Sequence, residues 1–390
     1  MNLAPGSPSP LMDGLLPLVQ AKQPEIIELI REFVECESPS NDPAAVNRFV
    51  DLVASKVAGV ARVRTFPGDR FGRHFRCEFK LPGRRKEGQI LALGHSDTVW
   101  ATGTLSNMPF RRGKGRLWGP GVLDMKSGIA FFLFAMQAIR ELDIPVPRKI
   151  VLQLNSDEEV GSDSSRPLTE DAARRSKAVL VLEPGTGLQG KLKTARKGVG
   201  AYNVTVTGKA SHAGVDFEAG ASAILELARQ IERIAGFTNL ARGVTVNPGV
   251  ISGGTRSNVV AAEARAEVDI RIARSKNQAA LDKKFRSLAA IDKRCSVTVD
   301  GGPNRPPMER TPAIRSLFQT ARGLAGQIGV ELDESATGGG SDGNFTAALG
   351  IPTLDGLGGV GEGAHASHES ILIDRIADRT ALLAMLVATL

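Results

Sequence analysis

The sequence contains little cysteine and few aromatic residues, and both shortages narrow the classes of protein that it can encode. Its three cysteines, Cys36, Cys77 and Cys295, lie far apart and are odd in number. They predict reduced cytosolic thiols, not a disulfide framework or a paired-cysteine metal site. Aromatic side chains make up 5% of the chain, with a single tyrosine. Nucleic-acid binding combines a basic face with interleaved aromatics, so we expect no nucleic-acid partner.

Long apolar runs are also missing. The run at residues 129–136 is far shorter than the 18 or so apolar residues that a membrane span needs, so we expect no membrane partner and a cytoplasmic protein. The first 14 residues, MNLAPGSPSPLMDG, lack the basic and apolar regions of a secretory signal, and we expect a disordered lead-in there. The net charge of +7 is spread over short clusters, which is typical of a solvated surface.

Polar residues follow the predicted strands closely. The apolar strand that begins at Gln89 ends in His95, and Asp97 comes two residues later. Alternate residues of a strand project to the same side. A carboxylate beside the second ring nitrogen of a histidine is typical of a metal ligand and its orienting partner. Taken alone, the pair could also be an ordinary polar loop start.

A second acidic position precedes a predicted helix. The glycine-rich loop at residues 113–124 ends in Asp124, and residues 129–142 have the apolar spacing of an amphipathic helix. The helix dipole favours a negative charge at such a position. Asp124 is therefore either a simple N-cap or a ligand held at the start of the helix.

Acidic residues or a histidine also follow three later strands, which we predict at residues 149–155, 178–182 and 351–354. These side chains are Asp157, Glu158, Glu159, Glu183 and His365. Consecutive acids repel one another, so a cation is expected beside them unless the turn is simply exposed. The carboxyl ends of strands form the functional crevice of open α/β sheets. Two imidazoles, several carboxylates and no cysteine suit two zinc ions, or cobalt or manganese, that share one carboxylate.

The pattern changes in the middle of the chain. From residue 198, the predicted order is strand, helix, two strands, helix and strand, which indicates a small α+β domain with an antiparallel sheet. We therefore expect an α/β fold. Residues 15–197 and 310–390 would form a metal-binding domain with a mostly parallel central sheet flanked by helices. Residues 198–309 would form the inserted domain.

Taken in order, the motifs resemble a di-zinc metallopeptidase family. It includes glutamate carboxypeptidase (carboxypeptidase G type), aminoacylase, acetylornithine deacetylase and succinyl-diaminopimelate desuccinylase. The motifs are HSD at His95, GVLDMKSG around Asp124, DEEVGS at Asp157, LEP at Glu183, GKASHAG at Gly208 and GAHASHE at His365. The resemblance covers nearly the whole chain past the first dozen residues. TGGGSD at Thr337 and the spacing from Glu159 to Glu183 are most similar to the glutamate carboxypeptidase branch.

The resemblance implies roles for individual residues. His95 and Glu183 would bind one metal ion, Glu159 and His365 would bind the other, and Asp124 would bridge both, with a cis peptide after it. Glu158 would be the general base, and Asp97 would support His95. The inserted domain would pair two subunits into a homodimer, and His212 would stabilise the oxyanion in the partner's site. The expected substrate-binding residues are Asn258, Arg305, Gly338, Gly339 and Gly340. His74 and His368 match no motif and are expected to be structural or exposed.

The expected activity is hydrolysis of an amide bond. A hydroxide between the two metals would attack the carbonyl of an N-acyl amino acid or peptide and release a C-terminal amino acid, with glutamate as one candidate. An N-acyl amino acid deacylase of the same family is the first alternative. A catalytically silent, metal-stabilised binding protein is the second.

Overall fold

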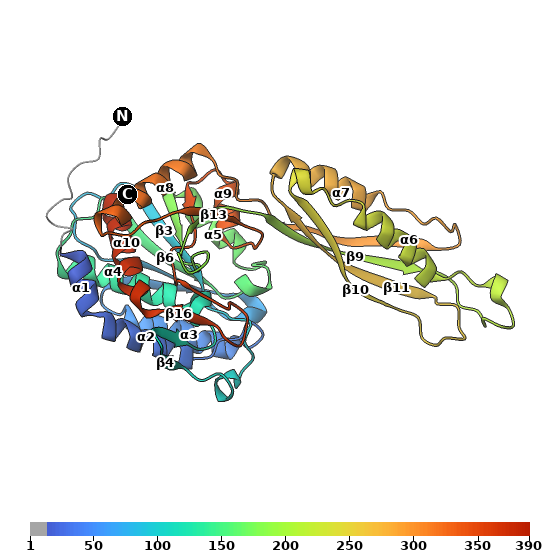
Figure 1. The fold of residues 1–390 in the computed structure, drawn as a ribbon, viewed down its shortest axis with the longest axis horizontal. Helices are drawn as coiled ribbons and strands as arrows, with labels where there is room; N and C mark the ends of the chain where they lie inside the picture. Colours follow the sequence, from blue (N-terminus) through green and yellow to red (C-terminus); the bar gives the residue numbers. More distant parts are fainter. Residues whose placement is uncertain (1–13) are drawn as a thin grey trace. The chain divides into compact units, whose positions relative to one another are not determined.

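The chain forms two compact units in the computed structural model, which describes residues 14–390 (Figure 1). Unit 1 contains the described residues up to Ala195, together with Arg310–Ala336 and Ser341–Leu390. Unit 2 contains Arg196–Glu309 and the short segment Thr337–Gly340. The expected lead-in lies outside the described residues apart from Gly14. The return of residues 337–340 to unit 2 was not predicted, because four residues carry too little periodicity to assign them to either unit.

A six-stranded mixed sheet forms the centre of unit 1. Its strands, in spatial order, are β1 (Ala61–Phe66), β2 (His74–Phe79), β6 (Lys149–Asn155), β3 (Gln89–His95), β7 (Ser176–Val181) and β14 (Thr353–Leu354). The last four run parallel to one another, whereas β1 and β2 are antiparallel to their neighbours. The central sheet is therefore mostly parallel, as expected, with two antiparallel strands at one edge. Apolar residues fill both faces of its central strands, as parallel sheets require.

Helices cover both faces of this sheet (Figure 1). The larger core lies beneath α1 (Leu15–Ala21), α2 (Gln23–Glu35), α3 (Pro43–Lys56), α4 (Ser127–Glu141), α8 (Pro312–Gln327) and α10 (Ile376–Thr389). The smaller core lies beneath α5 (Arg166–Arg174), which contacts α9 (Gly343–Ala348). Alternate residues of β3 separate the two cores: Ile90 and Ala92 join the larger one, and Leu91 and Leu93 join the smaller one. The period of two along a strand explains this division.

Helix α4 differs from the sequence-based prediction. It was expected to be amphipathic, but most of its residues are buried, on all sides, and it packs against α1, α2 and α10. The stretch Val122–Glu141 is long and apolar enough to cross a membrane, with a mean hydropathy of 1.5, yet 89% of its apolar window is buried inside the protein. A helix that is apolar on all sides belongs in the core of a large domain. Here that core helix begins at Ser127, three residues after Asp124.

Two small sheets complete unit 1, and neither was predicted because their strands are very short. One contains β15 (Gly361–Glu362), β16 (Ser370–Leu372), β5 (Arg116–Trp118) and β4 (Arg111–Gly113) in that order. The other pairs β8 (Leu192–Arg196) with β13 (Glu334–Thr337). The pairing of β16 with β5 brings the segment after His365 against the loop that leads to Asp124.

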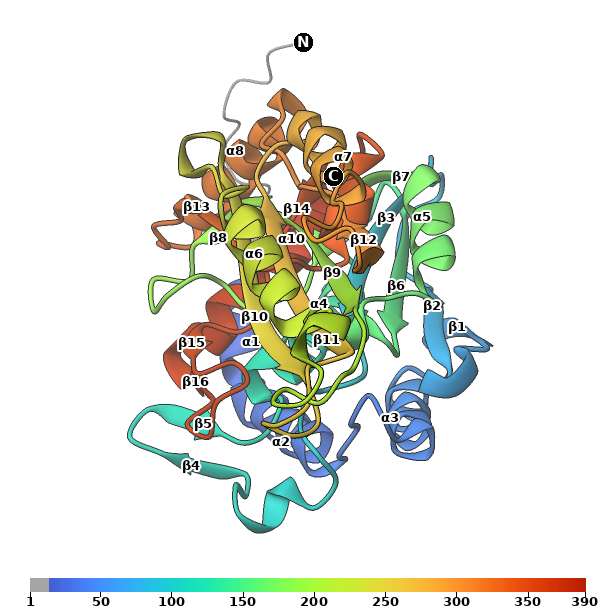
Figure 2. The ribbon, with the colours of Figure 1, turned by 90° about the vertical axis from the view of Figure 1, so that its right-hand side faces the viewer.

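Unit 2 is an antiparallel sheet with two helices on one face (Figures 1 and 2). Along the chain it contains β9 (Gly198–Thr207), α6 (Ala223–Ala235), β10 (Val244–Gly253), β11 (Glu263–Ile272), α7 (Gln278–Arg286) and β12 (Ser296–Arg305). The strand order is β10-β11-β9-β12, so β10 and β12 are edge strands. Alternate residues of β9, such as Tyr202 and Val204, form the core beneath the helices. Strand β12 is longer than expected and ends at Arg305.

Candidate metal centre

Strand ends in unit 1 bring the predicted metal ligands together. His95 is the last residue of β3, the turn that contains Glu158 and Glu159 follows β6, and Glu183 comes two residues after β7. These three strands are parallel neighbours, so their carboxyl ends meet at one edge of the sheet. Asp124 and His365 reach the same place from loops, and the Asp124–Met125 peptide is cis.

The carboxylate of Asp124 lies between the two histidines. Its Oδ1 atom is 3.2 Å from Nε2 of His95, and its Oδ2 atom is 3.4 Å from Nε2 of His365. Each histidine also faces a carboxylate of its own. His95 Nε2 is 3.6 Å from Oε1 of Glu183, and His365 Nε2 is 3.3 Å from Oε2 of Glu159. The result is two histidine–carboxylate pairs that share one aspartate.

The pKa values of both histidines show that this cluster carries excess negative charge. Hydrogen bonds with Asp124 and Glu159 raise the pKa of His365 to about 10. Burial lowers the pKa of His95, but its hydrogen bonds with Asp124 and Glu183 outweigh burial and hold this pKa well above its usual value. Burial likewise raises the pKa of Asp124, yet the bonds from both histidines keep it well below its usual value. The cluster therefore stabilises cations.

The donor set fits divalent metal ions. Nitrogen and oxygen ligand atoms of His95, Asp124 and Glu159 lie within 4.8 Å of one another, and the same holds for His95, Glu158 and Glu183. The Oε1 atom of Glu159 is buried and has no hydrogen-bond partner within residues 14–390. A buried carboxylate oxygen without a partner is costly unless a cation is present. Imidazole and carboxylate ligands suit zinc, cobalt and manganese.

Asp97 supports the centre in a different way from that expected. The Nδ1 group of His95 donates a hydrogen bond to the main-chain oxygen of Asp97 at 2.8 Å, whereas the Asp97 carboxylate lies 3.6 Å away. That carboxylate accepts hydrogen bonds from the main-chain N–H groups of Glu158 and Glu159, each at 3.2 Å. Burial raises the pKa of Asp97 to about 6. Asp97 thus joins the end of β3 to the acidic turn after β6.

His74 is structural, as the sequence analysis expected. It is fully buried, and Nδ1 lies 2.9 Å from the hydroxyl of Ser156, the residue just before the acidic turn. Burial lowers the pKa of His74, so the neutral imidazole is favoured. His368, the other histidine without a motif, is exposed.

Glu369 is the last residue of the GAHASHE motif, and the structure gives it a supporting role. Its Oε1 accepts hydrogen bonds from the N–H groups of Leu123 and Asp124, at 2.8 and 3.0 Å. Its Oε2 accepts one from Gly121 at 3.0 Å and one from the indole of Trp100 at 2.8 Å. Burial raises the pKa of Glu369 to about 7. This side chain fixes the loop that presents Asp124.

Two glycines allow the loops around Glu183 to approach closely. A Cβ atom at Gly128 or at Gly358 would lie 2.1 Å from the main-chain oxygen of Leu182, the residue before Glu183. Gly128 belongs to the first turn of α4, and Gly358 belongs to the loop that leads to His365. A side chain at either position would push apart segments that carry different ligands.

The remaining predicted site residues all belong to unit 2, where they form two groups. His212 and Asn258 meet near the end of β9 at Thr207, because the N–H of Ala213 bonds to the main-chain oxygen of Asn258 at 2.9 Å. Arg305 pairs with Val199 at the other end of β9. Residues 338–340 lie beside it, and a Cβ at Gly340 would be 3.0 Å from Cδ of Arg305. The part of β9 from Val199 to Thr207, roughly 27 Å at about 3.4 Å per residue, separates the two groups.

Comparison with known proteins identifies the family. The sequence profile of Peptidase family M20/M25/M40 matches residues 91–389. Carboxypeptidase G2 from Pseudomonas sp. (strain RS-16) is 29% identical over 388 residues, covering 95% of this chain and 90% of that protein. Aminopeptidase PepT from Bacillus cereus has a similar fold, with a TM-score of 0.78, 23% identity and coverage of 94% of this chain and 98% of that one. The Bacillus subtilis YXEP protein, described as a dinuclear metal-binding peptidase of the M20 family, also has a similar fold. Its TM-score is 0.69 at 13% identity, and the match covers 95% of this chain and 98% of that one. The chain therefore belongs to peptidase family M20/M25/M40 and is a metal-dependent amide hydrolase.

Proposed function

We propose that this protein is a two-metal exopeptidase of the carboxypeptidase type, which releases a C-terminal amino acid from an N-acyl or peptide substrate. The observation that carries the proposal is the position of Asp124, whose two oxygens face two separate histidine–carboxylate pairs. His95 and Glu183 would hold one ion, and His365 and Glu159 would hold the other. Zinc suits these nitrogen and oxygen ligands, with cobalt or manganese as substitutes.

Glu158 is the proposed general base. When bound, two divalent ions would make water a stronger acid and stabilise negative charge on the substrate oxygen. The carboxylate of Glu158 lies beside His95 and Glu183, and its main chain is held by Asp97. From this position Glu158 takes a proton from the attacking water and passes it to the leaving amine. Its neighbour Glu159 faces His365, so the two acids have different tasks.

The substrate carboxylate is assigned to the group around Arg305. This arginine is 8% exposed, and its guanidinium can bind a carboxylate through two parallel hydrogen bonds. The adjoining Gly338, Gly339 and Gly340 leave room for a ligand to approach the backbone. Similarity to carboxypeptidase G2 supports a carboxypeptidase activity and makes glutamate a candidate for the released residue. The three free cysteines are consistent with a cytoplasmic enzyme.

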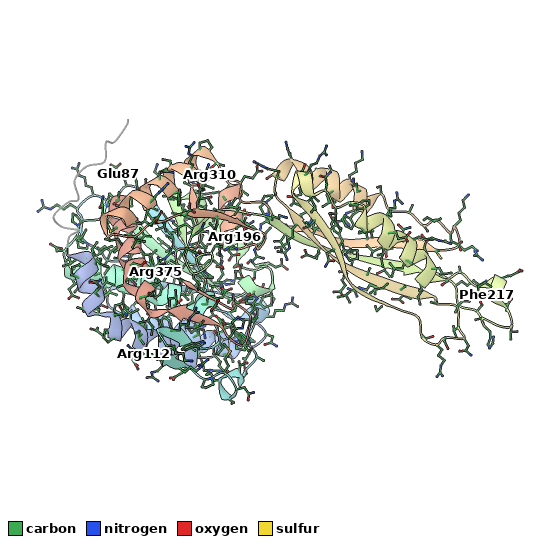
Figure 3. The ribbon with its side chains drawn as sticks, in the orientation of Figure 1. Glu87, Arg112, Arg196, Phe217, Arg310 and Arg375 are labelled. Carbon is green, nitrogen blue, oxygen red and sulfur yellow. The ribbon has the colours of Figure 1, made fainter. Side chains whose placement is uncertain are left out.

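His212 and Asn258 would serve the active site of a second subunit. Both lie at the end of β9 opposite Arg305, so His212 and Arg305 of one unit 2 are too far apart to contact the same small substrate. His212 is exposed, and so is Phe217 at the same end of unit 2 (Figure 3). An exposed imidazole can donate a hydrogen bond to a developing oxyanion. We infer that it does so across a homodimer.

The edge of unit 2 supports this homodimer. Strand β10 is an edge strand, and Val250 and Ile251 on it are 56% and 59% exposed. Ile224 and Leu225 in the first turn of α6 are 43% and 58% exposed. Unpaired strand edges with apolar side chains favour pairing with another chain. A second copy of the same strand and helix is the proposed partner.

Mixed dimers test the contribution of His212. His212→Ala and Glu158→Ala chains should each be inactive alone, because each lacks a group that every active site needs. In a hybrid dimer, one active site would combine an intact Glu158 with an intact His212, so about half of the activity per dimer should return. The measurement is turnover of purified hybrids that carry two different affinity tags. Verified hybrids without activity would contradict action across subunits.

A panel of N-acyl amino acids tests the activity itself. N-acyl-glutamate, N-acyl-leucine and N-acetylornithine would be incubated with the zinc-loaded enzyme, with and without a chelator, and amine release would be measured. We expect release that the chelator abolishes and that is fastest for glutamate. Release that favours N-acetylornithine would support the deacylase alternative instead. No release from any compound, with metal bound, would support the binding protein.

A further inference from the structure

One face of the edge strands in unit 1 carries a group of arginines that the proposed activity does not use. Arg62 and Arg64 lie on β1, two residues apart and therefore on the same face. In the antiparallel pairing of β1 with β2, Arg64 is directly opposite Arg76, and Arg62 is directly opposite Glu78. Two cations in directly opposite positions destabilise a sheet unless a nearby negative charge compensates them.

These side chains line a cavity of about 160 Å³. Arg175, at the end of α5, and Gln89, at the start of β3, line it as well. The cavity has room for about five water molecules, since each occupies about 30 Å³ in the liquid. That space can accommodate an ion of five heavy atoms.

Arg76 is held rigidly in this cavity. Its Nε and Nη2 groups donate hydrogen bonds to Oε1 of Gln153 at 3.0 and 2.7 Å, and Nη2 also donates to the main-chain oxygen of Leu168 at 2.9 Å. Its guanidinium also stacks on the ring of Phe66, 4.9 Å from the centroid. The Nη1 group makes no hydrogen bond within residues 14–390, so it is available to a ligand.

The cavity has a surplus of positive charge. Four guanidinium groups line it, against the single carboxylate of Glu78. Arg175 bonds to Asp171 at 2.6 Å, but Arg62 and Arg64 have no carboxylate within 4 Å in the described part of the chain. Burial lowers the pKa of Arg76; the Asp171 carboxylate acts against this decrease, and the nearby Arg175 and Arg64 add to it. An anion in the cavity would remove this repulsion.

Charged residues on an edge strand also prevent strands of different molecules from pairing. Arg62 and Arg64, both exposed on β1, would be sufficient for that purpose. They do not account for the fixed, half-buried Arg76 on the inner strand, or for Arg175, which reaches the same cavity from α5. Arginine side chains that converge on one cavity from β1, β2 and the end of α5 are typical of an anion-binding site.

We propose that this cavity binds a phosphate group, either as inorganic phosphate or as a small phosphate monoester. Guanidinium groups bind phosphate oxygens in pairs, and several of them together distribute the charge of a dianion. The site is separate from the metal ligands, since none of its lining residues belongs to that centre. Because the cavity exists only in the folded protein, phosphate bound there would raise the free energy of unfolding of unit 1.

Equilibrium dialysis of the metal-loaded full chain with radiolabelled inorganic phosphate tests this proposal, with ionic strength held constant by sodium chloride. The test variant is Arg62→Gln with Arg64→Gln, because both side chains are exposed and their loss should not prevent folding. The control is Arg84→Gln with Arg85→Gln, an exposed pair in the same unit that removes the same charge. The amount of phosphate held by the metal ions would be the same in the wild type, the test variant and the control.

We expect the dissociation constant for one phosphate to rise at least tenfold in the test variant and to stay unchanged in the control. Competition by glycerol 3-phosphate would assign the site to phosphate monoesters, and its failure to compete would assign the site to the free ion. Equal phosphate binding by the wild type and the test variant, or no binding by the wild type, would overturn the proposal.

Discussion

Replacing Glu158 by alanine should leave the metal content unchanged and lower turnover by about 10²–10⁴-fold, the usual contribution of a positioned general base. Glu158 lies beside His95 and Glu183, two of the five proposed ligands, but the two histidine–carboxylate pairs are complete without it. The proton of the attacking water would then have no acceptor at the right place. Turnover and bound metal would be measured on the same preparations, by amine release and by elemental analysis.

Asp163→Ala provides the control for this experiment. Asp163 is an exposed acid five residues after Glu158, so its loss changes the charge of the same segment without touching the centre. It should have normal turnover. Near-normal turnover of Glu158→Ala would remove Glu158 as the base. Loss of one metal ion from Glu158→Ala would instead make it a ligand beside His95 and Glu183, where its carboxylate also fits.

Asp124→Ala should remove both the bound metal and the activity. Its two oxygens face the two histidines separately, so this one carboxylate connects the two halves of the centre. Without this carboxylate, two cations would repel each other with no shared anion between them. Elemental analysis should find at most one weakly held ion per chain, and turnover should fall at least as far as in Glu158→Ala.

Asp124 also interacts directly with both histidines, so the fold of Asp124→Ala would be checked alongside its metal content. Circular dichroism and gel filtration would establish the fold. Glu369→Gln would be measured as a second variant. It keeps the shape of the side chain that holds the Asp124 loop, but it weakens the hydrogen bonds that this side chain accepts from Leu123 and Asp124. Two ions per chain in a folded Asp124→Ala protein would refute the bridging role.

The sequence alone predicted the elements that carry the site. Strands with long apolar runs, such as those ending at His95 and Asn155, are encoded locally, and the polar residues that follow a buried strand must lie at its end. The βαββαβ order of unit 2 was predicted for the same reason, because alternating and helical apolar periods are visible within each segment. Helix α4 was misjudged because periodicity cannot reveal that other helices cover its remaining sides.

What the sequence determined by itself was therefore the set of side chains at strand ends, and through them the family and its metal-dependent chemistry. The tertiary structure alone decided which atoms meet. It placed Glu369 on the main chain of Asp124, directed the Asp97 carboxylate to the acidic turn, and brought Arg175 to the arginines of β1 and β2. These contacts join residues that are far apart in the chain. Their geometry depends on how whole elements pack, and no local pattern of residues records that packing.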